Sequence, residues 1–456
     1  MGWRDDGSPM DIAPARDATP PAALGTRHEQ RSSVWVWVAA ACVGVLAAGM
    51  SAARVLTRNP ETFSTVLFAE DGIFPLCVLK VGAVACLADP YAGYLATAPR
   101  LLGTVVALSP LDSWAVVANS VAAVSVGVLA VVVFVSLVRG LAMTWVWAAL
   151  VALLPAAAPI VGFEAVNVYA SVYMPLLFTM LIVLVSWTPR RGPWWAAGGV
   201  FLSAVTIPLA VVLVVPLAVV AWRKRIRPRS LWIVSGGLFA GLLLQGFVMV
   251  TASHQRDTTI TFENVRGWVD ALPVAVGTVW PGVSFGESTV FGIFTTPVQT
   301  LTGWFLLLVG CVVAGWLLIR RDARRDAAAV LIVAGVFVGA VPAVTGDANN
   351  RYFVLPVLLW LAAGMILVAA RQWRNPTVAG VVTAAVLVFV WAPAFPSSPW
   401  RVHASPPWNV EAQRIIGSCA ANPDGHVDVV FTPDWPMPHV EVFEPTTGRL
   451  PCALLP

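Results

Sequence analysis

The adjacent carboxylates Glu70 and Asp71 are the residues of this sequence whose types best fit a chemical role. A positioned carboxylate can accept the proton of a hydroxyl nucleophile, and two neighbouring carboxylates can hold a divalent cation. Both also have ordinary structural uses, because Asp commonly caps a helix and Glu near a membrane is often only solvated. We expect Asp71 to be the base and Glu70 to be secondary, since Gly72 allows a substrate to approach the backbone beside Asp71.

Two arginines with polar neighbours are candidates for binding a phosphate. Arg100 follows Tyr94 at the beginning of an apolar stretch, and Arg351 follows Asn350 in a short turn before another. A guanidinium binds phosphate through paired hydrogen bonds, although an arginine near a membrane can also extend to ordinary lipid headgroups. The short turn favours a functional role for Arg351, and both roles of Arg100 remain open.

Glu164, Asn167 and Tyr169 form a further polar segment, which either lines the same cavity or caps adjoining helices. No spacing of Cys and His resembles a zinc site, and no P-loop, glycine-rich nucleotide fingerprint or serine nucleophile elbow occurs in a suitable context. The cofactor is therefore left undetermined, with a divalent cation at Glu70 and Asp71 as the one candidate. No nucleic-acid partner is expected.

The elements that must position these residues are membrane-spanning helices. A mean hydropathy of +0.79, with 58% hydrophobic and 11% charged residues over 456 positions, lies far outside the soluble range. Apolar runs long enough for a bilayer core of about 30 Å recur along the chain. They lie at Val34–Leu56, Asp112–Val138, Ala142–Val161, Tyr173–Trp187, Leu231–Val250, Leu301–Ile319, Ala327–Val344, Tyr352–Ala370 and Thr377–Phe395.

One apolar stretch, Trp194–Trp222, is too long for a single span and is interrupted by Pro208. Arg190 and Arg191 precede it, and five basic residues follow it between Arg223 and Arg229. Because short loops rich in Lys and Arg favour the cytoplasm, both ends should be cytoplasmic. The stretch is thus predicted to be a hairpin of two short helices, Trp194–Thr206 and Pro208–Trp222. The fold expected is an all-α polytopic membrane protein with about eleven spans.

Charge is distributed unequally between the two sides of this topology. The basic residues Arg139, Arg320, Arg321, Arg324, Arg325, Arg371 and Arg374 also fall on the cytoplasmic side. Inner loops hold only the acids Asp322 and Asp326. The outer side receives Glu61, Glu70, Asp71, Asp89, Glu164, Asp257, Glu263, Asp270, Glu287 and Asp347. We therefore expect an outward-facing site in a plasma (inner) membrane protein, with the N-terminus cytoplasmic and the C-terminus external.

Three regions flank or interrupt the predicted transmembrane domain 34–395. Residues 1–33 are expected to be a disordered cytoplasmic leader. The first external loop, 57–111, should contain surface helices at Phe74–Leu87 and Tyr91–Leu108, and a second long external loop covers 251–300. The small external tail 396–456 should contain a strand pair, at Val427–Phe431 and Val440–Phe443.

Four of the six cysteines lie outside the predicted spans. Cys419 and Cys452 share the external tail and are expected to form a disulfide. Cys77 and Cys86 share one predicted helix, on which they would be too far apart to bond unless the helix bends. Cys42 and Cys311 lie within spans and should be inert.

The predicted spans hold almost no ionisable residues, and Asn119 and Gln245 are their notable polar groups. Ion-coupled transporters usually carry ionisable residues or interrupted helices at mid-membrane depth. The interrupted stretch at Pro208 keeps a transporter in consideration, but it carries no charge.

The pair Glu70–Asp71, the surface segment with Tyr91, Tyr94 and Arg100, and the late turn Arg351–Phe353 resemble the C-type membrane glycosyltransferase superfamily. The paired short helices and the external tail add to the resemblance. It implies a donor sugar on a polyprenyl-phosphate carrier at the outer leaflet. By this resemblance, a first-loop carboxylate deprotonates the acceptor, and outer basic residues hold the carrier phosphate. The pair here is Glu-Asp, whereas several members have Asp-x-Asp or Asp-Asp.

The function expected is transfer of a sugar from a polyprenyl-phosphate donor to an envelope glycan, lipid or protein. Asp71 and Glu70 would serve catalysis, and the substrate-binding residues expected are Tyr94, Arg100, Glu164, Asn167, Asn350 and Arg351. Leaving-group charge on the carrier phosphate would be stabilised by fixed cations. The alternatives are a lipid-linked glycan flippase or polymerase, or another envelope transporter, and then a non-catalytic scaffold.

Overall fold

The structure is a computed structural model of the whole chain. The structure describes residues 25–56, 62–67, 69–91, 93–157, 168–187, 192–223, 228–252, 296–319, 322–345, 354–371, 375–391, 407–430 and 449–455. These residues are almost entirely helical, and one short antiparallel strand pair is the exception. The expectation of an all-α fold is therefore confirmed.

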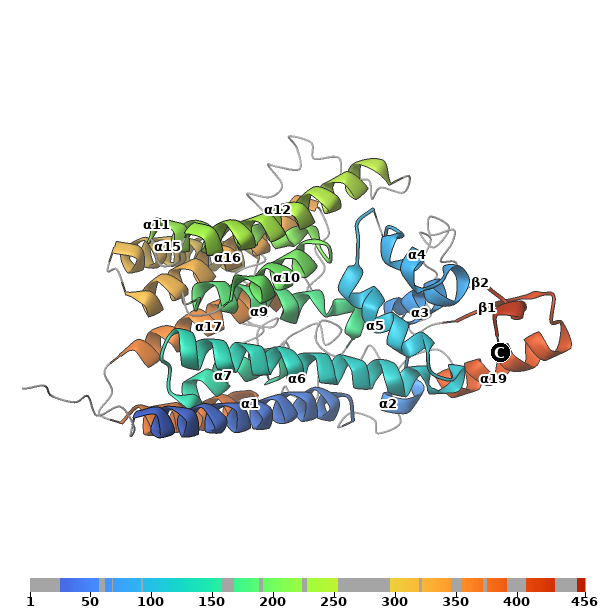
Figure 1. Cartoon of the computed structure of the whole chain (residues 1–456), viewed down its shortest axis with the longest axis horizontal. Helices are drawn as coiled ribbons and strands as arrows, with labels where there is room; N and C mark the ends of the chain where they lie inside the picture. Colours follow the sequence, from blue (N-terminus) through green and yellow to red (C-terminus); the bar gives the residue numbers. More distant parts are fainter. Residues whose placement is uncertain are drawn as a thin grey trace, which may run out of the picture.

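Each predicted span overlaps a helix of the bundle that fills the larger part of Figure 1. Its helices are α1 (Gly25–Leu56), α6 (Trp114–Gly140), α7 (Trp145–Ala157), α9 (Tyr173–Val185), α10 (Pro193–Ala204), η3 (Pro208–Leu213) with α11 (Val214–Trp222), α12 (Pro228–Thr251), α15 (Thr296–Ile319), α16 (Ala323–Thr345), α17 (Val354–Ala370) and α18 (Pro376–Trp391). Helix α1 begins at Gly25, so residues 25–33 are helical and not the disordered leader expected. The segment His28–Arg31 consists largely of residues compatible with a helix, which accounts for the earlier start.

Three segments of the described chain are long and apolar enough to cross a membrane: Val34–Leu56, Leu111–Gly140 and Pro228–Thr251. Several shorter apolar helices accompany them, among them Tyr169–Val185 and Val354–Ala370. Large apolar side chains such as Phe239 and Phe247 are exposed on the outside of the bundle. This pattern is compatible with a multi-pass membrane protein, whose lipid-facing surface is apolar.

Arg324, in the first turn of α16, joins the ends of two other helices. Its guanidinium donates to the carbonyl oxygens of Leu141 (2.9 Å), Ala142 (2.7 Å) and Ala369 (3.1 Å). The first two follow the end of α6, and the third is in the last turn of α17. The last carbonyls of a helix lack partners within the helix and carry partial negative charge, so a cation there satisfies and stabilises them.

An ion pair lies at the same end of the bundle. Arg223, just after α11, forms two hydrogen bonds of 3.1 Å to the buried carboxylate of Asp326 in α16. Arg139 at the end of α6 lies over the ring of Trp37 in α1, with its Cζ atom 5.1 Å from the ring centroid. Several helix ends therefore meet at one end of the bundle: the ends of α6, α11 and α17, the start of α16, and the part of α1 around Trp37. We call this the basic end.

The interrupted stretch forms the predicted hairpin. Helices α10 and α12 pack in parallel, with Gly237 against Ala197 and Gly241 against Ala204. Because α10 and α12 are parallel, their first residues lie at the same end of the bundle. Helix α12 begins soon after α11 ends, so the end of α11 also lies near the start of α10. The chain therefore turns back at Val205–Ile207, where Ile207 is extended and Pro208 begins the next helix. Pro fits there because a first helical position needs no N–H partner within the helix.

Glycine at position 241 is required by this close packing. A Cβ atom at Gly241 would lie 2.7 Å from the Cβ of Ala204, whereas one at Gly246 of the same helix would meet nothing within 4 Å. We expect Gly241→Ala to destabilise the protein by about 1–3 kcal/mol, the usual effect of overpacking. Gly246→Ala should be neutral or stabilising by up to about 1 kcal/mol. Thermal unfolding of both variants in one detergent measures the difference, and equal midpoints would contradict this packing.

At the opposite end from the basic end lies a second group of elements, which we call the loop–tail module. It comprises α2 (Thr62–Thr65), α3 (Ala69–Val81), α4 (Ala83–Ala88), α5 (Thr97–Ala107), η1 (Leu111–Ser113), η2 (Tyr169–Ser171), α19 (Trp408–Ala421), β1 (His426–Asp428), β2 (Arg449–Pro451) and η8 (Cys452–Leu454). Figure 1 shows α3, α4 and α5 at the right-hand end of the bundle, beside the start of α6, and α19 beyond them. Side chains of the first loop and of the tail share one apolar core there.

Two local expectations for this module need correction, and a third lies partly outside the described residues. The predicted helix Phe74–Leu87 is broken at Gly82 (φ 83°), and the predicted helix from Tyr91 begins only at Thr97. Strand β1 pairs with β2, with Val427 opposite Leu450, and the expected partner Val440–Phe443 lies outside the described residues. Glycine permits the positive φ at which the first helix breaks, and a strand partner so distant in sequence leaves no local signal.

Candidate functional site

Asp71 lies in the first turn of α3 and is buried, with 1% of its surface exposed. Its Oδ1 accepts a hydrogen bond of 2.8 Å from the backbone N–H of Ala170. The hydroxyl of Tyr169 donates to the backbone carbonyl of Asp71. These contacts bind the start of α3 to η2, so Asp71 has a fixed orientation. Glu70 precedes it in the same turn of helix.

The packing of α5 against α3 depends on Gly103. A Cβ atom there would lie 2.7 Å from the Cβ of Phe74 and 3.3 Å from the Tyr169 hydroxyl. The absence of a side chain lets α5 approach both groups, and the fully buried Tyr169 fills the space between α3, α5 and η2. The position of Asp71 is thus set by residues from three separate parts of the sequence.

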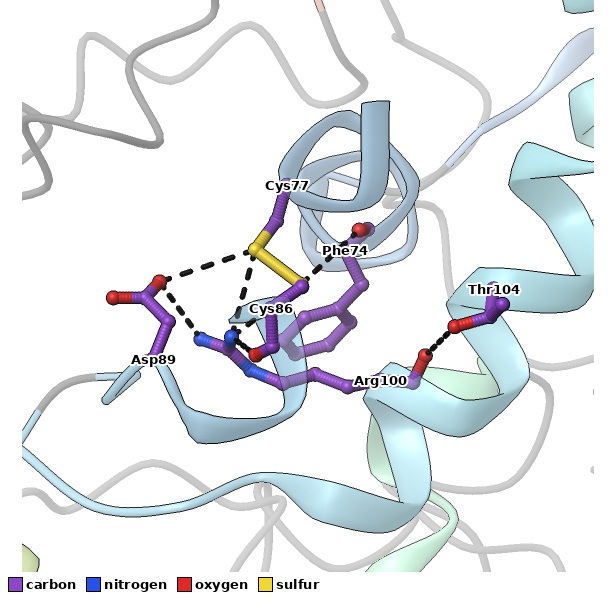
Figure 2. The surroundings of a disulfide bond; sticks show 6 residues. All are labelled: Phe74, Cys77, Cys86, Asp89, Arg100 and Thr104. Atoms are coloured by element: carbon purple, nitrogen blue, oxygen red, sulfur yellow. Dashed lines mark hydrogen bonds and ion pairs between the residues drawn. A yellow bond between two sulfur atoms is a disulfide. The ribbon is translucent and has the colours of Figure 1, made fainter. Parts of the chain in front are cut away.

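Arg100 lies elsewhere than expected. It is 1% exposed, whereas the sequence predicted a side chain at the membrane surface. Its guanidinium donates to the carbonyl of Cys86 and, over 3.3 Å, to Asp89 (Figure 2). Burial lowers the pKa of Arg100 and the charge of Asp89 opposes this, but an arginine remains protonated at neutral pH. Arg100 is therefore a buried structural cation, and we omit it from the phosphate site.

A disulfide joins Cys77 to Cys86 beside this arginine (Figure 2), and the bend without which the sequence predicted no bond between them is present. The break at Gly82 folds α4 back on α3 and brings the two Cα atoms to 5.7 Å, within the range of a disulfide. Nη1 of Arg100 lies 3.5 and 3.4 Å from the two sulfur atoms. In the tail, a second disulfide joins Cys419 to Cys452.

Aromatic rings connect the surroundings of Asp71 and Arg100. Phe74 lies under the Arg100 guanidinium, at 5.8 Å, and its ring is 5.2 Å from Tyr91 and 6.3 Å from Tyr169. Tyr94 is half-buried and packs edge-on against Tyr91 at 6.1 Å, across a tight turn at Gly93. The structure thus brings Asp71, Tyr94 and Arg100 into one module, with Phe74 central to it.

The polar residues of the predicted spans hold this module on the bundle. Gln245 of α12 accepts from the N–H of Leu95 (3.1 Å), and Asn119 of α6 donates to the carbonyls of Phe63 (3.0 Å) and Val66 (3.2 Å). At the hairpin turn, the Thr206 hydroxyl accepts from the N–H of Ala98 (3.1 Å). These side chains satisfy backbone groups of non-helical segments and of helix ends, which would be costly to bury unpaired.

The remaining predicted site residues, Glu164, Asn167, Asn350 and Arg351, lie outside the described residues. Within the residues that were described, no group of three or more His, Cys, Asp and Glu side chains is placed to hold a metal ion.

Several structurally important residues were missed in the sequence. Asp89 was counted only as one of many external acids, and Tyr169 only as a neighbour of Glu164. Trp408 and Glu411 of α19 received no role at all. The signal for Asp89 and Arg100 was an opposite charge pair in a largely apolar loop, whereas Tyr169, Trp408 and Glu411 act through partners distant in sequence.

The buried carboxylate of Glu411 predicts a pH dependence for the tail. Burial alone would raise the pKa of Glu411, but hydrogen bonds from Arg414 (2.6 and 2.8 Å) and from the N–H of Val430 (2.9 Å) outweigh it and lower the pKa. A carboxyl group whose pKa is lower in the folded than in the unfolded protein stabilises the fold at any pH above its unfolded-state pKa. This stabilisation is lost as the pH falls through the folded-state pKa. Protection of α19 against hydrogen exchange, measured relative to the intrinsic exchange rate at each pH, should therefore fall below about pH 4.3, the ordinary pKa of Glu.

Glu411→Gln should weaken this dependence on acid. Asp424 is exposed, so Asp424→Asn serves as the control and should retain the dependence. An unchanged acid response in Glu411→Gln would assign the dependence to another group.

Comparison of the sequence with protein-family models and with curated proteins finds no match. The class is therefore defined by the fold: a helical protein whose apolar helices are compatible with several membrane crossings and which carries a compact loop–tail module at one end.

Proposed function

We propose that this protein is a membrane glycosyltransferase that uses a polyprenyl-phosphate-linked sugar and belongs with the C-type enzymes that its sequence resembles. On this proposal all eleven helical segments cross or enter the plasma (inner) membrane. The basic end is cytoplasmic, because arginine-rich loops favour that side, and the loop–tail module is external. The acceptor is an envelope glycan, lipid or protein.

The observation that carries the proposal is the placement of Asp71. It lies in the module opposite the basic end, and its carboxylate is oriented by Ala170. A general base needs a fixed position near the proton that it accepts. The neighbouring bundle provides an apolar exterior beside which the lipid part of a donor can remain in the bilayer.

The reaction follows from these positions. The acceptor hydroxyl attacks the anomeric carbon, forming a new C–O bond while the bond from that carbon to the carrier phosphate breaks. Asp71 takes the hydroxyl proton, and polyprenyl phosphate leaves. Arg351, which the sequence places at the start of a span on the same side, stabilises the negative charge of the leaving phosphate.

The burial of Asp71 has a consequence for this mechanism. Since only 1% of it is exposed, the acceptor can reach it only after side chains above it move. On this proposal the described arrangement is a closed state, which opens when donor or acceptor binds, as substrate-induced loop movement does in many enzymes.

A lipid-linked glycan flippase is the second candidate, because the hairpin at Val205–Ile207 interrupts the bundle as transporter helices are interrupted. Alternating access would require parts of the bundle to move apart at each end in turn. Arg324 joins α6, α16 and α17 at the basic end, and Arg223 with Asp326 joins α11 to α16. These bonds oppose opening there and favour the enzyme.

The test is direct assay of the purified protein in lipid nanodiscs with a panel of short-chain polyprenyl-phosphate sugars and envelope glycan acceptors. We expect a sugar to appear on the acceptor together with an equal amount of polyprenyl phosphate. Movement of an intact lipid-linked glycan across liposomes without any such product would favour the flippase instead.

A further inference from the structure

We propose that the C-terminal part of the loop–tail module, α19 with β1 and β2, is a positioning element for the first loop, and that Trp408 is its principal contact. The inference extends the proposed function, because Asp71 is the residue that would be positioned. It also has a purely structural consequence, which can be measured without any substrate.

Trp408 joins the tail to the start of α6. Its buried ring stacks on that of Trp114, with centroids 5.8 Å apart and an interplanar angle of 8°. Its indole N–H donates to the carbonyl of Leu111 at 2.7 Å, and the indole N–H of Trp114 donates to Ser109 at 3.2 Å. Both tryptophans thus combine ring contact with a satisfied polar group, the arrangement that makes large aromatic residues effective anchors.

The tail continues from this anchor to the helix that carries Asp71. Strand β2 packs against α3, and the fully buried Leu450 of β2 shares one apolar core with Leu67, Phe74 and Tyr169. Phe74 is one helical turn after Asp71 in α3, and Tyr169 donates to the Asp71 carbonyl. Removal of the tail would therefore take away packing from both elements that hold Asp71.

The tail is rigid enough to transmit this support. The Cys419–Cys452 disulfide connects α19 to the segment after β2. Glu411 connects α19 to the segment after β1 through the N–H of Val430, and the carbonyl of Gly425 accepts from the N–H of Cys452 at 3.0 Å. The helix and both strands consequently behave as one unit, so a change at Trp408 is felt at β2.

The experiment compares Trp408→Ala with Trp408→Phe and with Val410→Ala, whose side chain is 54% exposed on the same helix. Hydrogen exchange is followed in peptides of α3 and, as an internal reference, of α16. In Trp408→Ala we expect exchange of α3 to rise more than about tenfold, which corresponds to roughly 1.4 kcal/mol, while α16 is unchanged. Trp408→Phe keeps an aromatic ring at this position and should retain most of the protection of α3. Val410→Ala should match the wild type.

Turnover provides the second measurement. A small displacement of a catalytic group can reduce rate about 10²-fold, so kcat of Trp408→Ala should fall strongly while KM for the donor stays close to wild type. If Trp408→Ala does not fold, Leu450→Ala in β2 replaces it, with the same expected acceleration in α3.

The outcomes separate the two proposals. Unchanged exchange in α3, or equal acceleration in α3 and α16, would overturn the positioning role whatever the activity. Faster exchange confined to the loop–tail module supports it, even in a protein that transfers no sugar, in which case only the proposed function fails.

Discussion

Asp71→Asn is expected to lower sugar transfer by about 10²–10⁴-fold, the usual contribution of a general base. Asparagine keeps a side-chain oxygen that can accept from the N–H of Ala170, so the bond between α3 and η2 survives. What it loses is the ability to take a proton. Initial rates with a short-chain polyprenyl-phosphate sugar measure the change, and a thermal unfolding midpoint near that of the wild type shows that the fold is retained.

Two further variants make this result specific. Asp71→Ala removes the acceptor for Ala170 as well, so it should lower both activity and thermal stability. Glu70→Gln should be the milder lesion, because Glu70 is assigned a secondary role. Wild-type turnover in Asp71→Asn would show that Asp71 serves the fold alone and that the base lies elsewhere.

Arg351→Ala is expected to lower turnover by about 10²–10³-fold, the usual effect of removing one donor that stabilises developing negative charge. Arg351→Lys should also be substantially impaired, because an ammonium does not reproduce two parallel hydrogen bonds to a phosphate. Arg351 lies outside the described residues, so this prediction rests on its place in a short turn before a predicted span.

Arg100 provides the contrast for this measurement. Since its guanidinium is bound to Cys86 and Asp89 inside the module, Arg100→Lys should lower thermal stability while leaving KM for the donor close to wild type. Arg371→Ala, at the basic end, should leave turnover unchanged. Activity of Arg351→Ala within about threefold of wild type, far from the effect of a lost charge stabiliser, would reduce Arg351 to a headgroup anchor.

The sequence by itself determined the class of fold and the approximate place of each bundle helix. Apolar runs specify helices wherever they occur, because a helix satisfies its own backbone groups through bonds between near neighbours. The hairpin was predictable for the same reason: Pro208 interrupts the run locally, and basic residues mark both of its ends.

Only the tertiary structure decided what the polar residues do. Whether Arg100 faces a membrane or the half-buried Asp89 depends on the bend at Gly82, which also brings Cys77 to Cys86. Strand β2 was not predicted, and Trp408 received no role, because their partners lie far along the chain. Contacts between such distant segments arise when preformed elements pack together. Residue type and spacing therefore show which groups are able to meet. The three-dimensional arrangement of the elements determines which of these groups do meet.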